Sequence, residues 1–152
     1  MYRPLRLYPV LLCIGCLGFA GAGAAPAVAP CELLTLPDVQ DAVGGQWRVW
    51  QDLSGEDVCA YQSSPSSIIS LQVVSDPMGA TAILELRRTA AGDKARPADG
   101  IGEGAYRLVM PTANVVMFGK GETVVQLEVS FAASTDTAVA EKLAKAAYDR
   151  LP

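Results

Sequence analysis

The chain has 152 residues, of which 51% are hydrophobic and 18% charged, and it contains no histidine. The missing histidine excludes Ser-His-Asp and Cys-His nucleophilic systems, the HExxH metal helix and every His-ligated zinc site. The formal net charge of −4 argues against binding to nucleic acid or to an anionic membrane surface, because both need a basic footprint. The length is that of one domain, since domains typically have about 100–200 residues.

The N-terminus has the pattern of a signal peptide. Arg3 and Arg6 form a basic region, residues 7–19 form an apolar core, and residues 20–30 supply small residues for cleavage. Cleavage is predicted after Ala24, the last residue of an A-x-A site. The second half of the apolar stretch, residues 20–30, holds only Gly, Ala and Pro apart from Val28, so we expect no stable membrane span after cleavage.

These features divide the chain into a signal peptide at residues 1–24, a flexible N-terminal segment at 25–30 and a single domain at 31–152. The predicted location is periplasmic or secreted. Two alternatives stay open, namely an uncleaved membrane anchor and a lipoprotein acylated on Cys16.

The cysteines that remain after cleavage are Cys31 and Cys59, because the other two leave with the signal peptide. Removal of Arg3 and Arg6 also changes the net charge from −4 to −6. An even pair of cysteines in an exported chain predicts a disulfide bond, since the compartment beyond the membrane is oxidising. Two free buried thiols are the alternative if the chain is not exported.

The first half begins with a helix that Thr35 caps and that Gly44-Gly45 ends, because Pro37 and Asp38 suit a first helical turn. Three short strands bounded by turn residues are expected next, at residues 46–53, 58–62 and 68–75. The third strand alternates apolar and polar residues, which is typical of a sheet with one polar or partly covered face.

The second half begins with a helix opened by Asp76-Pro77 and ended by Gly92. Its expected buried face holds Ala82, Ile83, Leu86 and Ala90. Residues 92–100 are predicted to form a polar loop. Strands are expected at residues 105–110, 115–118 and 123–131, followed by a closing helix that begins near residues 134–136 and ends near Arg150.

The predicted order is therefore α-β-β-β, α-β-β-β, α. Short turns within each triplet of strands indicate antiparallel neighbours. The predicted fold class is α+β, with an antiparallel sheet of about six strands packed against helices.

The candidate ligand-binding residues are two tryptophans and two arginines. Trp47 and Trp50 are three positions apart, so on one strand they would point to opposite faces. One indole would enter the core, and the other would lie under a helix or be exposed, where it could anchor a ligand or partner. Arg87 and Arg88 could bind an acidic ligand or simply face solvent. We predict no catalytic residue, no metal ligand and no cofactor, since the G-x-G-x-G at residues 100–104 lacks the strand-loop-helix context of a nucleotide site.

Several short motifs occur together in the chain, and they are C-E-L-L-T at residues 31–35, C-A-Y at 59–61 and G-I-G-E-G-A at 100–105. They resemble the C-x-L-L-T…C-x-Y…G-[IV]-G-[DE]-x-A pattern of small exported bacterial domains of unknown function, as in actinobacterial envelope lipoproteins. The resemblance implies a Cys31–Cys59 bridge and an α/β sandwich akin to the Mog1/PsbP-like folds. It implies no activity.

The favoured hypothesis is a non-enzymatic periplasmic or secreted module that binds a small molecule or an envelope protein, and no nucleic acid. One alternative is a carboxylate-based hydrolase of an envelope glycan, which would need two acidic groups across a cleft. Another is an inhibitor of a hydrolase, which would present residues 63–67 or 92–100 as a protruding loop. The loop carboxylates available to the first alternative are Asp52, Glu56, Asp57, Asp93, Asp99 and Glu103.

Overall fold

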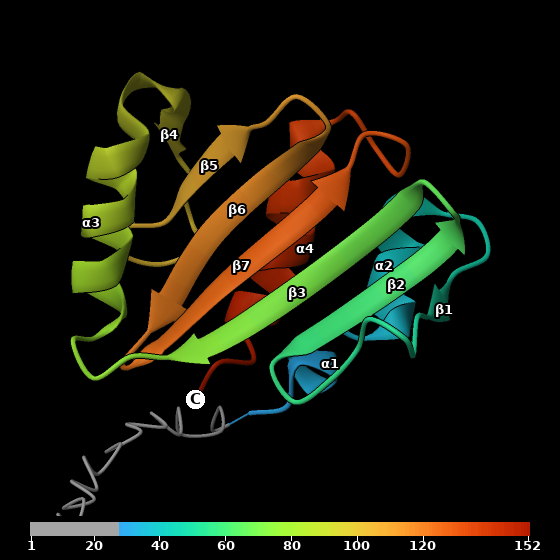
Figure 1. Cartoon of the computed structure of the whole chain (residues 1–152), viewed down its shortest axis with the longest axis horizontal. Coiled ribbons are helices and arrows are strands. Elements are labelled where there is room, and N and C mark those ends of the chain that lie inside the picture. Colours follow the sequence, from blue (N-terminus) through green and yellow to red (C-terminus); the bar gives the residue numbers. More distant parts are fainter. Residues whose placement is uncertain (1–27) are drawn as a thin grey trace, which may run out of the picture.

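Seven antiparallel strands form one sheet in the order β1-β2-β3-β7-β6-β5-β4 in the computed structural model, which describes residues 28–152 (Figure 1). The strands are β1 (Arg48–Val49), β2 (Val58–Ser64), β3 (Ser67–Ser75), β4 (Ala95–Pro97), β5 (Tyr106–Val109), β6 (Ala113–Lys120) and β7 (Thr123–Ser130). The helices are α1 (Pro30–Leu33), α2 (Leu36–Val43), α3 (Ala80–Ala91) and α4 (Thr137–Tyr148), with a short 3-10 helix, η1, at Gly92–Lys94.

The predicted α+β fold with an antiparallel sheet packed against helices is confirmed. The seventh strand, β4, lies in the segment that was expected to be a loop at residues 92–100. It forms because Ala95 and Pro97 pair with Leu108 and Tyr106 at the edge of β5. The two halves of the chain join where β3 pairs with β7.

The predicted signal peptide at residues 1–24, the lipoprotein alternative at Cys16 and residues 25–27 of the predicted flexible segment lie outside the described residues. At the start of the described chain, Val28 packs against the core and Pro30 begins α1.

The two faces of the sheet are covered very differently. Helices α1, α2 and α4 lie behind the sheet in Figure 1 and pack against one face, which we call the covered face. The side chains of Tyr61, Leu71, Phe118 and Leu127 reach the main core there and are almost completely buried. The opposite face, which we call the open face, carries α3 over β6 and the start of β7.

The buried face of α3 differs from the expected one. Ala80, Ile83 and Leu84 are buried against the open face, whereas Leu86 is 61% exposed. The helix also begins later than expected, because the Asp76 carboxylate accepts a hydrogen bond from the Met78 amide in a tight turn before Ala80.

The predicted disulfide bond between Cys31 and Cys59 is present and joins α1 to β2, with 5.1 Å between the two Cα atoms. Cys59 is fully buried in the core, whereas Cys31 is exposed. Next to the bridge, the buried Tyr61 hydroxyl donates a hydrogen bond to the carbonyl oxygen of Leu34. The segment between α1 and α2 is therefore fixed to the sheet both covalently and by a buried hydrogen bond.

Candidate functional site

A pocket of about 390 Å³ opens between α3 and the open face of the sheet, and we call it the α3 groove. One face of α3 carries Ala80, Leu84 and Arg87 at helical spacing. The first two are buried against the sheet, but Arg87 is exposed and lines the groove. The groove therefore begins where the apolar stripe of α3 gives way to a charged side chain.

The floor of the groove is apolar. It includes Leu108 of β5 together with Val115 and Met117 of β6, and the last two are nearly buried. The turn at residues 110–112, between β5 and β6, forms the rim, where Met110 is 43% exposed. The volume lies within the range of about 300–1,000 Å³ that is usual for small-molecule sites with mostly apolar walls.

Two charged residues line the groove, Arg87 on α3 and Glu128 on β7. Neither forms an ion pair with another residue in the described part of the chain, where the ion pairs join Arg107–Glu141, Lys145–Asp149 and Arg150–Asp38. Their charges are therefore available to a ligand in the groove.

Tyr106 places its ring in the same lining, with only 2% of the residue exposed. Burial raises the pKa of Tyr106, and the positive charge of Arg87 partly offsets this rise. The phenol therefore stays protonated at neutral pH and can donate a hydrogen bond.

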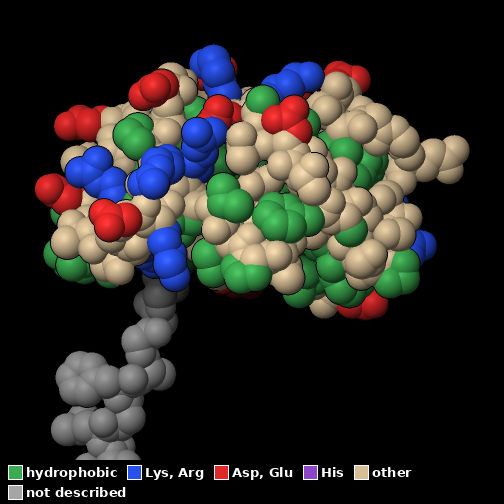
Figure 2. Space-filling view, turned by 90° about the horizontal axis from the view of Figure 1, so that it is seen from above, with side chains coloured by type: hydrophobic (Ala, Val, Ile, Leu, Met, Phe, Trp, Pro, Cys, Tyr) green, Lys and Arg blue, Asp and Glu red, His purple; other side chains and the backbone are tan. Residues whose placement is uncertain are grey.

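The surroundings of the groove are mixed in chemistry. Figure 2 views the molecule from above and shows Lys and Arg side chains interspersed with Asp and Glu on the side of α3 and β4, next to a group of hydrophobic side chains. Exposed basic residues on that side include Arg88 on α3 and Lys94 in η1, while Met110 on the rim is 43% exposed. An amphipathic ligand therefore matches the region better than a uniformly polar one.

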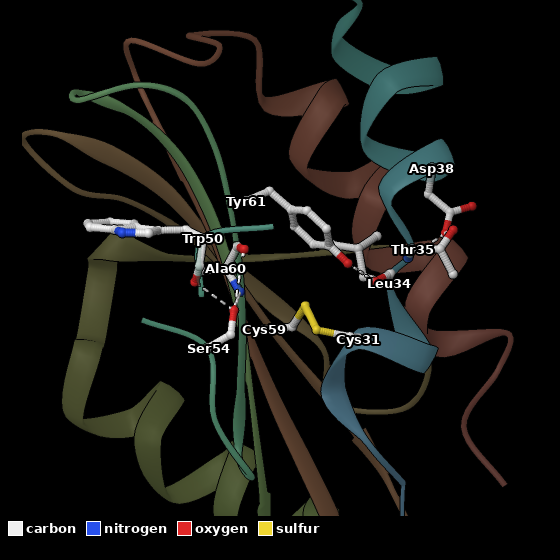
Figure 3. Close-up of a disulfide and its surroundings, with 9 residues drawn as sticks. All are labelled: Cys31, Leu34, Thr35, Asp38, Trp50, Ser54, Cys59, Ala60 and Tyr61. Atoms are coloured by element: carbon white, nitrogen blue, oxygen red, sulfur yellow. Dashed lines mark hydrogen bonds between the residues drawn. A yellow bond between two sulfur atoms is a disulfide. The ribbon is translucent and has the colours of Figure 1, made fainter. Parts of the chain in front are cut away.

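The two tryptophans lie on opposite faces, as their spacing predicts. Trp47 is buried in the main core, and its indole nitrogen donates to the carbonyl oxygen of Gly44 at 2.8 Å. The Trp50 amide donates to the carbonyl oxygen of Ala60 and continues the strand pairing. Figure 3 shows its indole on the side of the sheet away from the disulfide.

The strand register gives the distance from Trp50 to the groove. Trp50 lies beside Ala60 on β2, which pairs with Ser70 on β3, which in turn pairs with Glu128 on β7. Trp50 therefore shares the open face with the groove but lies about 14 Å, or three strand spacings, from Glu128.

The predicted ligand-binding residues are thus not brought together. Arg87 lines the α3 groove, whereas its neighbour Arg88 is exposed outside the lining. Tyr106, Val115 and Glu128 were not predicted as site residues. The only sequence signal for Glu128 was its position among the outward-facing residues of the strand at 123–131.

A second pocket, of about 350 Å³, lies at the β1 edge of the sheet and is lined mainly by polar residues. Trp47 borders it, but only 7% of this residue is exposed. Arg48 and Gln62 face each other there through a hydrogen bond of 3.3 Å. The α3 groove has the larger apolar surface and unpaired charges, so it is the stronger candidate.

The features required by the alternative functions are dispersed. Each of the six loop carboxylates named above is exposed, and the α3 groove contains one carboxylate, that of Glu128. Residues 64–67 form a tight hairpin, in which the Ser67 hydroxyl donates a hydrogen bond to the carbonyl oxygen of Ala132, and residues 92–97 form η1 and β4.

Within residues 28–152, no group of three or more acidic or cysteine side chains could hold a metal ion. No helix in the same range is long and apolar enough to cross a membrane.

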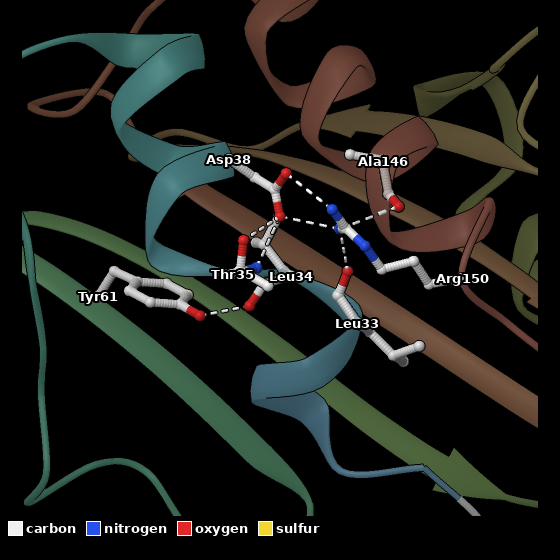
Figure 4. Close-up of polar contacts among 7 residues, drawn as sticks. All are labelled: Leu33, Leu34, Thr35, Asp38, Tyr61, Ala146 and Arg150. Atoms are coloured by element: carbon white, nitrogen blue, oxygen red, sulfur yellow. Dashed lines mark hydrogen bonds and ion pairs between the residues drawn. The ribbon is translucent and has the colours of Figure 1, made fainter.

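The strongest charge cluster of the described residues joins α2 to the end of the chain (Figure 4). Arg150 binds both carboxylate oxygens of Asp38, at 2.8 and 2.9 Å, and also donates to the carbonyl oxygen of Leu33. Asp38 additionally accepts hydrogen bonds from the amide and hydroxyl of Thr35. Burial alone would raise the pKa of Asp38, but these hydrogen bonds and the charge of Arg150 lower it from 3.8 to about 2.

We expect Asp38→Asn to lower the free energy of unfolding at pH 7 by about 1 to 2 kcal/mol, with solvent screening at the 40% exposed Arg150 allowed for. Because folding lowers this pKa, the stabilisation is complete above 3.8 and is lost as the pH falls to about 2. Urea unfolding of both proteins between pH 7 and pH 2 measures the difference, which should shrink across that window. Asp41→Asn, on the exposed side of the same helix, is the control, and an equal pH dependence in both variants would contradict the prediction.

No known family model and no curated protein matches the sequence. The fold and the groove themselves define the class: a disulfide-bonded α+β protein with a three-helix covered face and a partly open face that carries an amphipathic groove.

Proposed function

We propose that this protein is an exported, non-enzymatic binding module and that it holds an amphipathic small ligand in the α3 groove. The observation that carries the proposal is the combination of an apolar floor and two unpaired opposite charges in one pocket of about 390 Å³. Apolar walls supply most of the affinity in such sites, and a few polar groups fix the ligand's orientation. The disulfide supports the exported location, because such bonds persist in oxidising compartments.

The groove supports binding better than it supports hydrolysis. Hydrolysis of a glycan by carboxylates needs an acid and a partner carboxylate about 5–9.5 Å apart. The lining holds Glu128 alone, and its other charged residue is Arg87. The arrangement can therefore orient a ligand, but it lacks the pair of groups that this reaction uses.

A substitution that fills the groove from its rim tests the proposal. Thr112 lines the groove but is exposed, so Thr112→Trp places an indole over the floor without altering the core. The probe is 1-anilinonaphthalene-8-sulfonate, an apolar anion that fluoresces in dry sites, excited beyond the absorption of tryptophan. We expect saturable binding to the native protein and about tenfold weaker binding to Thr112→Trp, because the added ring occupies the same volume.

The matched control is Thr135→Trp, which adds the same ring at an exposed position outside the groove lining. This variant should bind the probe like the wild type. Equal binding by all three proteins, or equal loss in both variants, would refute the groove as the binding site.

A further inference from the structure

Tyr106 is the most deeply buried polar residue in the lining of the α3 groove. Only 2% of Tyr106 is exposed, whereas Arg87 and Glu128 are exposed and Gln126 is half-buried. The remaining polar side chain of the lining, that of Thr112, is exposed on the rim. These four side chains remain accessible to water, so the hydroxyl of Tyr106 is the polar group that meets the buried part of a ligand.

The ring of Tyr106 packs among apolar side chains. They include Ile83 and Leu84 of α3 and Met117 of β6. No residue in the described range 28–152 forms a hydrogen bond with the Tyr106 hydroxyl, which is nevertheless not fully enclosed by protein. By contrast, the buried hydroxyl of Tyr61 in the main core donates to a carbonyl oxygen. The Tyr106 hydroxyl is therefore a hydrogen-bonding group that opens into the groove.

A ligand that fills the groove must pair with this hydroxyl or leave it without a partner. Covering a hydroxyl without a partner costs free energy, and this cost rejects ligands that offer no hydrogen bond to it. Burial raises the pKa of Tyr106 above its ordinary value of 10, so the group is protonated at neutral pH and can donate. The ligand therefore needs an acceptor oxygen in its buried part as well as apolar surface.

A carbonyl oxygen meets this requirement better than a hydroxyl group. A ligand hydroxyl would accept from the phenol but would bring a hydrogen of its own, for which Leu84 and Met117 offer no good acceptor. A carbonyl oxygen accepts and has no hydrogen to satisfy. Resting on the proposed function, we propose that the α3 groove binds an apolar carbonyl compound and that Tyr106 determines this specificity by donating a hydrogen bond to the carbonyl oxygen.

Two fluorescent naphthalenes that differ in one group test the proposal by titration. The first is 6-propionyl-2-(dimethylamino)naphthalene, a ketone, and the second is its 6-propyl analogue, in which a methylene group replaces the carbonyl. Tyr106→Phe removes the hydroxyl and keeps the ring. We expect this variant to bind the ketone about fivefold more weakly than the wild type does, through the loss of one hydrogen bond, and to bind the propyl analogue at least as tightly.

The emission spectrum of the bound ketone gives a second readout. A hydrogen bond to its carbonyl oxygen stabilises the excited state and moves the emission to longer wavelength. The ketone bound to Tyr106→Phe should therefore emit at shorter wavelength than the ketone bound to the wild type.

The matched control is Tyr148→Phe, which removes a tyrosine hydroxyl from α4, outside the groove lining, where the ring packs on Phe118. This variant should bind both naphthalenes like the wild type and leave the emission of the ketone unchanged. Thr112→Trp should weaken the binding of both, because it fills the volume that both occupy.

Each outcome decides one part of the proposal. If Tyr106→Phe weakens the binding of both naphthalenes equally, or of neither, the hydroxyl does not select the carbonyl and the proposal is overturned. If the ketone does not bind the wild type while 1-anilinonaphthalene-8-sulfonate still distinguishes Thr112→Trp from Thr135→Trp, the ligand class is overturned and the groove stands as a binding site. If 1-anilinonaphthalene-8-sulfonate does not distinguish these two variants, the proposed function itself fails.

Discussion

Replacing Cys31 and Cys59 together with alanine is expected to lower the free energy of unfolding by about 3.6 kcal/mol. The bridge closes a loop between residues 28 positions apart. Without it the unfolded chain gains conformational entropy, and in the chain-entropy model this gain lowers the free energy of the unfolded state by about 3.6 kcal/mol. Part of the effect is local, since the bridge holds α1 against β2 and Cys59 lies fully buried in the core. Such a loss is a large fraction of the 5–15 kcal/mol that typically stabilises a native protein.

Urea unfolding followed by tryptophan fluorescence measures this loss, because Trp47 is buried in the same core. The control is the wild-type protein reduced with dithiothreitol, which opens the same bond without changing a side chain. Reduced wild type and double variant should unfold at similar urea concentrations, both well below that of the oxidised protein. A double variant as stable as the oxidised protein would show that the bridge adds nothing to stability.

The parts of the fold that the sequence predicts well are those determined by local chemistry. The helix after Thr35 begins and ends as expected, because its cap, its first-turn proline and its terminal glycine are adjacent in sequence. The opposite orientation of Trp47 and Trp50 follows from the alternation of side chains along extended backbone. The disulfide follows from the pairing of the two cysteines that would remain after cleavage of the predicted signal peptide.

The elements that the sequence predicts poorly depend on distant partners. Ala95–Pro97 has no apolar alternation, and it is a strand because the edge of β5 supplies hydrogen-bond partners. The first strand, expected at 46–53, is reduced to Arg48–Val49 because the chain turns at once, with the amides of Leu53 and Ser54 bonded to the Trp50 carbonyl. Tertiary context decides such short segments.

The buried face of α3 is hard to predict because the groove interrupts it. Ala80 and Leu84 begin an apolar stripe, but the next position on that face is Arg87, which lines the groove. The competing stripe that includes Leu86 is more continuous in sequence, yet it faces solvent. A position where local pattern and structure disagree is often a functional one, and here the disagreement falls on a residue of the candidate site.

Gly119→Ala is expected to lower the free energy of unfolding by about 3 kcal/mol, because the start of α3 packs directly on this residue of β6. A Cβ atom at this position would lie 2.3 Å from the carbonyl oxygen of Thr123 and 2.7 Å from the Cβ of Ala80. The first neighbour is backbone in the paired strand β7, so it cannot move without breaking the sheet pairing. The second would have to move outward with the whole first turn of α3.

The matched control is Gly55→Ala, since a Cβ atom at Gly55 meets nothing within 4 Å. This change should alter stability by less than about 1 kcal/mol, as is usual for a glycine whose conformation alanine can adopt. Urea unfolding compares both variants with the wild type.

The same substitution should also affect binding in the groove. Because Ala80 and the groove lie on the same face of α3, an outward shift of the first turn of this helix should weaken binding of 1-anilinonaphthalene-8-sulfonate to Gly119→Ala and leave binding to Gly55→Ala unchanged. Equal stability of the two variants would mean that α3 does not need this close approach to the sheet.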